Sequence, residues 1–359
     1  MNKSDKIDDK RLISVFAQFR ARLKDAPRKL TFRQGSDFTK WKKEFRRKVL
    51  ELLGRFPKRV PLNIEILEEE IIDDFVGEGV PIYKQQKIVY NTEPYASCVA
   101  YLLIPEDIKK NEKRPAILSA HGHGSGKNKL IGWDPVTFNP GNDLPNYEAA
   151  AIHFVREGYI VIVPDWRPFG ERKLNDAYTR PNRDPCNVTY MSFGYFGYNL
   201  LALNVWDAMR TIDVLETISS VDKKRIGMVG KSYGGTMTTY TAALDNRIKA
   251  AVISGYLSTL NDALSMRALG NYCGSQYLPG LLEWGDIPDI AGLIAPRPLL
   301  IEAGKKDECF VIDDATKAYK HLHRIYHAAN ASEKLSRDVA DVEHSYIFKN
   351  LLPFLAQNL

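Results

Sequence analysis

The clearest chemical signal in this sequence is a serine flanked by glycines, in the stretch Gly-Lys-Ser-Tyr-Gly-Gly at residues 230–235. A short apolar run, 226–229, precedes it, and a run with helical character, 236–244, follows it. The pattern G-x-S-x-G has meaning in this strand-turn-helix setting, because a tight, strained turn leaves no space for side chains beside the serine. The serine oxygen would then be exposed at the carboxyl edge of a sheet. We therefore predict that Ser232 is a nucleophile.

A serine hydroxyl needs a histidine to take its proton and a carboxylate to orient that histidine. Four histidines follow the serine in the chain: His321, His323, His327 and His344. The first three fall in one helical stretch, 319–327, where surface positions are expected. His344 falls in a loop between the last expected strand and an apolar terminal helix, 347–355. We predict that His344 is the base.

The acid is expected in a loop after a strand, between the serine and the histidine in chain order. The strand 299–302 is followed by Ala-Gly-Lys-Lys-Asp-Glu, in which Asp307 comes after a glycine turn. We prefer Asp307 to Glu308 for this reason. Asp313 and Asp314 are read instead as the start of the next helix, where carboxylates suit the helix dipole.

A second stretch, Ser-Ala-His-Gly-His-Gly-Ser-Gly-Lys-Asn-Lys at 119–129, admits several kinds of site. A phosphate loop would need glycine at the position of His121 and serine or threonine at the position of Asn128. A zinc site would need ligands beyond His121 and His123, and none is evident on this loop. We expect no metal and no cofactor.

Periodicity predicts the elements that hold these residues in place. Apolar residues at three- and four-residue intervals predict two helices in the first sixty residues. A hairpin is expected from 82–90 and 97–104, with 91–94 as its turn. After it, short apolar runs alternate with helical segments, which predicts a parallel sheet covered by helices. The runs are 116–119, 160–163, 225–229, 250–253 and 298–302, and the helices are 146–156, 200–216 and 236–244.

The expected organisation is an N-terminal helical extension, 1–78, followed by a catalytic domain, 79–359. Segments 171–198 and 256–290 interrupt the alternation, and long loops of this kind usually build a site or a lid. Whether the extension packs on the domain or joins protomers into a homo-oligomer is left open.

Composition excludes several classes of function. The chain has 359 residues, of which 44% are hydrophobic and 26% charged, as in a folded globular protein. The net charge of +6 arises from basic residues at helical spacing, so we expect no nucleic-acid partner. No secretory leader or membrane span is evident, and the four cysteines have no disulfide-dense spacing, which together favour a cytoplasmic protein.

The serine segment 221–235 resembles that of α/β-hydrolase superfamily enzymes, both acetyl xylan esterase-like or dienelactone hydrolase-like enzymes and prolyl oligopeptidase-type peptidases. Segments 165–172 and 293–304 look more like the acetyl xylan esterase-like group. The resemblance covers roughly residues 80–359. It implies an α/β-hydrolase fold, with a mostly parallel central sheet flanked by helices.

The resemblance also implies two backbone donors for the negative oxygen that develops during acyl transfer. One is expected to be the N–H of Tyr233, and the other to come from the turn after strand 116–119, at His123 or Gly124. His121 would then fix the turn.

The expected pocket residues are Trp166 or Arg167, in the loop after strand 160–163, and Tyr195, in an aromatic group that could wall an acyl pocket. The alternatives are that Asp165 and Arg167 pair to hold their loop, and that the aromatic group is plain loop core.

The expected function is a serine carboxylesterase acting on a small-molecule ester through Ser232, His344 and Asp307. Small acyl groups, such as acetyl on a sugar, are what the resemblance implies. Two alternatives remain open: a prolyl oligopeptidase-like peptidase, and a binding protein with a hydrolase fold and no catalysis.

Overall fold

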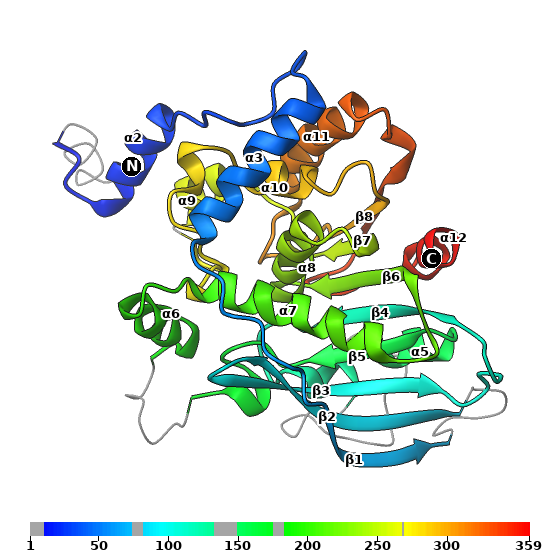
Figure 1. Ribbon diagram of the computed structural model, residues 1–359. Helices are drawn as coiled ribbons and strands as arrows, with labels where there is room; N and C mark the ends of the chain where they lie inside the picture. The colour runs from blue at the N-terminus through cyan, green and yellow to red at the C-terminus, as the bar shows by residue number, and fades with distance from the viewer. Residues whose placement is uncertain (1–10, 74–81, 133–148, 175–182, 268) are drawn as a thin grey trace.

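The computed structural model describes residues 11–73, 82–132, 149–174, 183–267 and 269–359. Within these residues the chain forms one nine-stranded sheet in the order β1-β2-β3-β5-β4-β6-β7-β8-β9 (Figure 1). In this order, neighbouring strands from β1 to β5 pair antiparallel. Neighbouring strands from β5 to β9 pair parallel. The strands are β1 Glu65–Ile72, β2 Tyr83–Glu93, β3 Ala96–Pro105, β4 Arg114–Ala120, β5 Ile160–Pro164, β6 Val221–Lys231, β7 Ile248–Ser254, β8 Leu299–Gly304 and β9 Leu335–Ala340.

Helices cover both faces of this sheet (Figure 1). The α-helices are α2 Val15–Asp25, α3 Phe38–Leu53, α4 Lys127–Leu130, α5 Ala150–Arg156, α6 Pro185–Tyr195, α7 Leu200–Thr217, α8 Tyr233–Leu244, α9 Leu260–Arg267, α10 Ile287–Gly292, α11 Ile312–Ala328 and α12 Leu351–Asn358. Short 3₁₀ turns are η1 Gly170–Arg172, η3 Gly274–Gln276, η4 Leu281–Glu283 and η5 Ser332–Lys334. The predicted fold class, a mostly parallel sheet between helices, is confirmed.

The central strands are apolar on both faces because each face has its own core. In β4, Leu118 packs in the core that includes α3, α7, α8, α10 and α11, while its neighbour Ile117 packs in the core that includes α5 and α12. In β6, Met228 packs in the same core as Leu118, and Val229 packs in the same core as Ile117. Successive strand residues point to opposite faces, so a sheet covered on both sides gives continuous apolar runs. The runs in the sequence therefore predicted these strands correctly.

The N-terminal helix α3 packs on the chain's own domain. Trp41 stacks on Phe45 with ring centroids 5.7 Å apart. A Cβ atom at Gly285 would lie 2.7 Å from the Phe45 ring, and one at Gly292 would lie 3.2 Å from Trp41. Helix α3 is therefore in close contact with α10 and the segment before it, within the predicted insertion 256–290.

Residues 65–72 are a correction to the sequence analysis, which placed them in a helical extension. They form β1, the edge strand that pairs with β2. Glutamates at three successive positions hide the alternation, and they are stabilised across the ladder by polar partners: the side chain of Gln85 donates to Glu70 at 2.7 Å. The division at residues 78 and 79 lies outside the described residues and stays a prediction.

Other predicted boundaries need smaller changes. The terminal helix begins at Leu351 rather than at 347. The N–H groups of Ile347 and Phe348 donate to the buried carboxylate of Glu302, at 3.4 and 3.1 Å, which keeps this stretch out of the helix. Predicted helix residues 146–148 lie outside the described part. Segment 171–198 contains helix α6, whose first turn is capped by Asp184.

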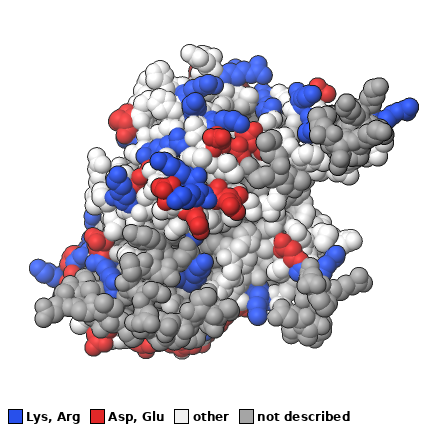
Figure 2. Space-filling view, turned by 180° about the vertical axis from the view of Figure 1, so that it is seen from behind, with Lys and Arg blue, Asp and Glu red and all other residues white. Residues whose placement is uncertain are grey.

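Charges of both signs lie next to one another on the face seen in Figure 2. Among the described residues, no helix is both long enough and apolar enough to span a bilayer.

Candidate active site

Ser232 lies in a strained turn between β6 and α8. Its φ and ψ are 60° and −121°, a conformation that costs a residue with a side chain roughly 1–3 kcal/mol. A Cβ atom at Gly230 would lie 2.2 Å from the Gly234 carbonyl oxygen, and one at Gly234 would lie 2.0 Å from the Ala120 carbonyl oxygen. The serine N–H donates to the Ser254 carbonyl at 3.0 Å. The turn therefore has the geometry that the glycine spacing predicted.

His344 and Asp307 form a hydrogen-bonded pair. His344 Nδ1 lies 2.8 Å from Asp307 Oδ2. The other carboxylate oxygen of Asp307 accepts the N–H groups of Cys309 and Phe310, at 2.8 and 2.9 Å. Asp307 is 4% exposed, and the ring of Phe310 stacks on the imidazole at 5.9 Å. The carboxylate thus fixes the proton on Nδ1, which leaves Nε2 to accept one.

Gly255, at the end of β7, makes room for this pair. Its φ is 50°, and a Cβ atom there would lie 3.2 Å from both Cε1 and Nδ1 of His344. Strand β7 lies between β6, which leads to Ser232, and β8, which leads to Asp307. Any larger residue at position 255 would crowd the His344 ring. The sequence analysis did not single out Gly255, because one glycine in a strand-loop junction is a common feature.

Ser232 and His344 line the same cavity, which has a volume of about 390 Å³. Its other walls come from the turn after β4, from 270–273 in the predicted insertion, and from Cys309 and Phe310 in the loop after β8. The cavity lies at the carboxyl ends of the parallel strands, where ligands bind in open α/β sheets. The structure therefore brings the predicted nucleophile, base and acid to one edge of the sheet.

Lys231 is a neighbour of the serine that the sequence analysis passed over. Its side chain is 7% exposed, and its Nζ donates to the backbone carbonyl of His344 at 3.0 Å. The residue directly before Ser232 thus holds the loop that carries His344.

The turn after β4 lies against Ser232. A Cβ atom at Gly122 would lie 3.4 Å from the Ser232 Cβ, and both Gly122 and His123 line the cavity. Gly124, the other predicted donor, is not among the lining residues. Tyr233 is the first residue of α8, so its N–H is one of the donors that a helix leaves without an internal partner. The oxyanion donors stay a prediction, to which Gly122 is added.

His121 supports this turn as a neutral imidazole. It is fully buried, and its Nε2 accepts the N–H of Trp166 at 3.0 Å. Nδ1 therefore carries the proton and donates to the Gly122 carbonyl at 2.7 Å. Burial lowers the pKa of His121 to about 4, against a smaller opposing effect of Asp165, so the ring is uncharged at neutral pH.

Lys127 and the nearby glycines surround a buried carboxylate, that of Asp165. This carboxylate accepts Nζ and the backbone N–H of Lys127, both at 2.8 Å, and the N–H of Glu171 at 3.0 Å. Cβ atoms at Gly126 and Gly170 would lie 2.3 and 2.2 Å from it. The glycine-rich stretch that could have been a phosphate loop thus encloses a side chain of the protein itself.

The three predicted pocket residues do not line the cavity. Trp166 is fully buried beneath the turn, and Tyr195 on α6 is 93% exposed. Arg167 pairs with Asp207 at 2.8 and 2.9 Å and with Glu93 at 2.7 Å, rather than with Asp165. These ion pairs join segments far apart in the sequence, which is why local spacing did not reveal them.

The sequence matches the abhydrolase family over residues 2–341, which is nearly the whole chain. The chain belongs to this family. Among curated relatives it is 26% identical to "Putative hydrolase YtaP" of Bacillus subtilis (strain 168), over 81% of this chain and 89% of that protein. It is also 25% identical to "Uncharacterized peptidase YuxL" of the same organism, over 74% of this chain but 37% of that protein.

Among solved structures, the fold is similar to that of a putative acetyl xylan esterase from Bacteroides fragilis NCTC 9343. The TM-score is 0.77, with 20% identity, and the match covers 96% of this chain and 94% of that one. Family and structural neighbour agree with the superfamily resemblance found in the serine segment, and confirm the fold.

Proposed function

We propose that this chain is a serine carboxylesterase. The observation that carries the proposal is the 2.8 Å hydrogen bond between His344 and Asp307, in a cavity that Ser232 also lines. A strained serine turn, an oriented imidazole and a buried carboxylate in one place are the requirements for acyl transfer through a covalent intermediate.

Ser232 Oγ attacks the ester carbonyl, and His344 Nε2 takes its proton. The carbonyl oxygen becomes negative and is bound by the N–H of Tyr233 and by an N–H of the turn at 122–124, each worth about 3–4 kcal/mol in the transition state. His344 then protonates the leaving alcohol. A water molecule, deprotonated by His344, then attacks the acyl group. His344 returns this proton to Ser232 Oγ as the acid leaves, and Asp307 stabilises the charged imidazole in both steps.

The favoured substrates are esters of small acyl groups such as acetyl. The cavity volume of about 390 Å³ is near the lower end for ligand sites. The structural neighbour with the TM-score of 0.77, which this chain matches end to end, is described as a putative acetyl xylan esterase. The match to a peptidase covers 37% of that protein and supports amide cleavage less well.

A panel of substrates tests the proposal. It contains p-nitrophenyl esters of increasing acyl length, acetylated xylosides and an aminoacyl arylamide, with Ser232→Ala as the blank. A second cavity of about 770 Å³ shares the lining residues Tyr272 and Cys273 with the first and so adjoins it. Longer acyl chains are included to test whether they use this second cavity. We expect acetate to be the best acyl group, with kcat lower by ~10⁴–10⁶-fold in Ser232→Ala.

Two results would contradict this function. Faster cleavage of the arylamide than of any ester would favour a peptidase. Turnover that is equal in the native protein and in Ser232→Ala would favour a binding protein that lacks catalysis.

A further inference from the structure

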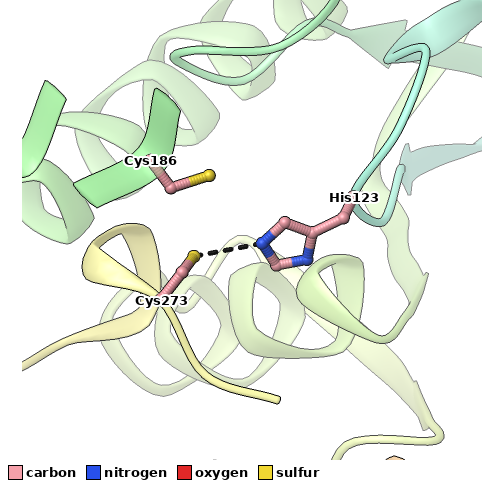
Figure 3. Close-up of side chains that lie close together, drawn as sticks. All are labelled: His123, Cys186 and Cys273. Carbon is pink, nitrogen blue, oxygen red and sulfur yellow. Dashed lines mark hydrogen bonds between the residues drawn. The ribbon is translucent and has the colours of Figure 1, made fainter. Parts of the chain in front are cut away.

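Three side chains with metal-binding atoms meet beside the catalytic cavity. They are His123 in the turn after β4, Cys186 in the first turn of α6, and Cys273 directly before η3 (Figure 3). One ligand atom from each lies within 4.8 Å of the other two. His123 Nε2 and Cys273 Sγ are 3.0 Å apart. The triad described above uses none of the three side chains.

The two thiols are held in place by tight packing between α6 and η3. The N–H of Gly274 donates to Asn187 Oδ1 at 2.7 Å, and a Cβ atom at Gly274 would lie 2.4 Å from the Cβ of Tyr190. Because Cys186 and Cys273 are each next in sequence to a residue of this contact, their backbones are fixed relative to one another.

The imidazole is held in place as well. The His123 ring packs at 5.2 Å, edge to face, on Phe169 and at 5.3 Å on Tyr233. Figure 3 shows its Nε2 directed toward the Cys273 sulfur, with the Cys186 sulfur facing the same space. The three ligand atoms thus converge from three separate segments.

Two thiolates and one imidazole form a ligand set suited to Zn²⁺. Zinc bond lengths of about 2.3 Å to sulfur and 2.0 Å to nitrogen place tetrahedral ligand atoms roughly 3.5–3.8 Å apart. The observed separations, 3.0 Å for one pair and up to 4.8 Å for the set, differ from this by about one ångström at most. Side-chain rotation alone can close such a difference.

We propose that His123, Cys186 and Cys273 bind one Zn²⁺ ion. Cys186 is 2% exposed and does not line the catalytic cavity, whereas His123 and Cys273 line it. The ion would therefore lie at the wall of this cavity. The ion ties the turn after β4 to both predicted insertions, 171–198 and 256–290.

A second group, Asp307, Cys309 and His344, has similar spacing. A metal ion there would have to replace the 2.8 Å hydrogen bond between His344 and Asp307. The first group gives up the contacts of the Cys273 thiol with the His123 imidazole, at 3.0 Å, and with the Ser275 hydroxyl, at 2.8 Å, and neither contact involves His344 or Asp307. We therefore assign the ion to His123, Cys186 and Cys273.

Titration with Co²⁺, a coloured substitute for Zn²⁺, tests the assignment on the full chain. The protein is kept reduced with a phosphine, and all four thiols are confirmed free beforehand. We expect one equivalent of Co²⁺ to give a thiolate-to-metal charge-transfer band and intense tetrahedral ligand-field bands, both removed when Zn²⁺ is added. Zn²⁺ should also raise the Tm of the reduced protein.

Variants decide which residues hold the ion. Cys186→Ala and Cys273→Ser should weaken Co²⁺ binding by more than the roughly 10–100-fold that loss of an outer-shell partner costs. Cys309→Ala is the matched thiol control and should retain the band. Ser232→Ala should also retain it, which separates this proposal from the proposed function. His123→Ala tests the site if substitution of the buried Cys186 prevents folding.

The proposal is overturned if the reduced native protein gives no thiolate band. It is equally overturned if Cys309→Ala loses the band and Cys186→Ala keeps it, because the ion would then lie at the catalytic pair.

Discussion

Two turns lie side by side at the carboxyl edge of the sheet, one after β4 and one after β6, and they are held in different ways. The turn after β6 is fixed by backbone contact: Gly230 and Gly234 have no space for a Cβ atom. The turn after β4 is fixed by buried polar side chains, namely His121 and the ion pair between Lys127 and Asp165. Steric limits hold Ser232, the proposed nucleophile, and buried polar groups hold the turn expected to bind the oxyanion.

The two kinds of support fail differently. A steric contact between backbone segments cannot relax by moving a side chain, so an added methyl group shifts the turn itself. A buried ion pair that loses one partner leaves an uncompensated charge in the interior. Substitutions can therefore separate the two mechanisms.

The largest effect is expected from Lys127→Met. The side chains of Lys127 and Asp165 are 1% and 0% exposed, so the variant leaves a buried carboxylate without its cation. We expect a loss of about 3–5 kcal/mol in the free energy of unfolding, measured by urea denaturation. Adding Asp165→Asn should restore part of this loss.

Lys306→Met is the matched control for that variant. Lys306 pairs with Asp341 at 3.0 Å, but the two side chains are 61% and 67% exposed. Its loss should cost less than about 1 kcal/mol. If Lys127→Met costs no more than Lys306→Met, the buried pair does not stabilise the turn after β4.

A somewhat smaller effect is expected from Gly234→Ala. The new Cβ atom would lie 2.0 Å from the carbonyl oxygen of Ala120, the last residue of β4. The serine turn would therefore have to move away from the end of β4. We expect a loss of up to about 3 kcal/mol in the free energy of unfolding and a fall in kcat, because Ser232 shifts.

The control is Gly194→Ala in α6, where a Cβ atom would meet nothing within 4 Å. This change should be neutral or stabilise the protein by up to about 1 kcal/mol. Equal Tm values for the two alanine variants would contradict steric control of the serine turn.

The two turns also differ in how well they could be predicted from the sequence, because the contacts of one are local in the chain and those of the other are long-range. Ser232 and its glycines are neighbours in the chain, so their spacing predicted the turn. His344 and Asp307 could be chosen because chain order and strand ends limit the candidates. Apolar runs predicted the central strands for an equally local reason, since both faces of the sheet are covered.

Long-range polar contacts could not be predicted in this way. Lys127 and Asp165 are 38 residues apart, and His123 and Cys273 are 150 apart. The predicted pocket residues Trp166 and Arg167 do not line the cavity for the same reason, since burial and long-range ion pairs set their positions, and Tyr195 is exposed on α6. The edge strand β1 was not predicted, because its successive glutamates interrupt the alternation of apolar and polar residues that indicates a strand.

The most direct test of the central claim, that the turn after β6 presents Ser232 as the nucleophile, is labelling with a fluorophosphonate followed by intact-mass and peptide analysis. We predict one adduct per chain, located on Ser232, with labelling slowed in His344→Ala and absent in Ser232→Ala. An unlabelled native protein, or an adduct that persists in Ser232→Ala, would contradict the account.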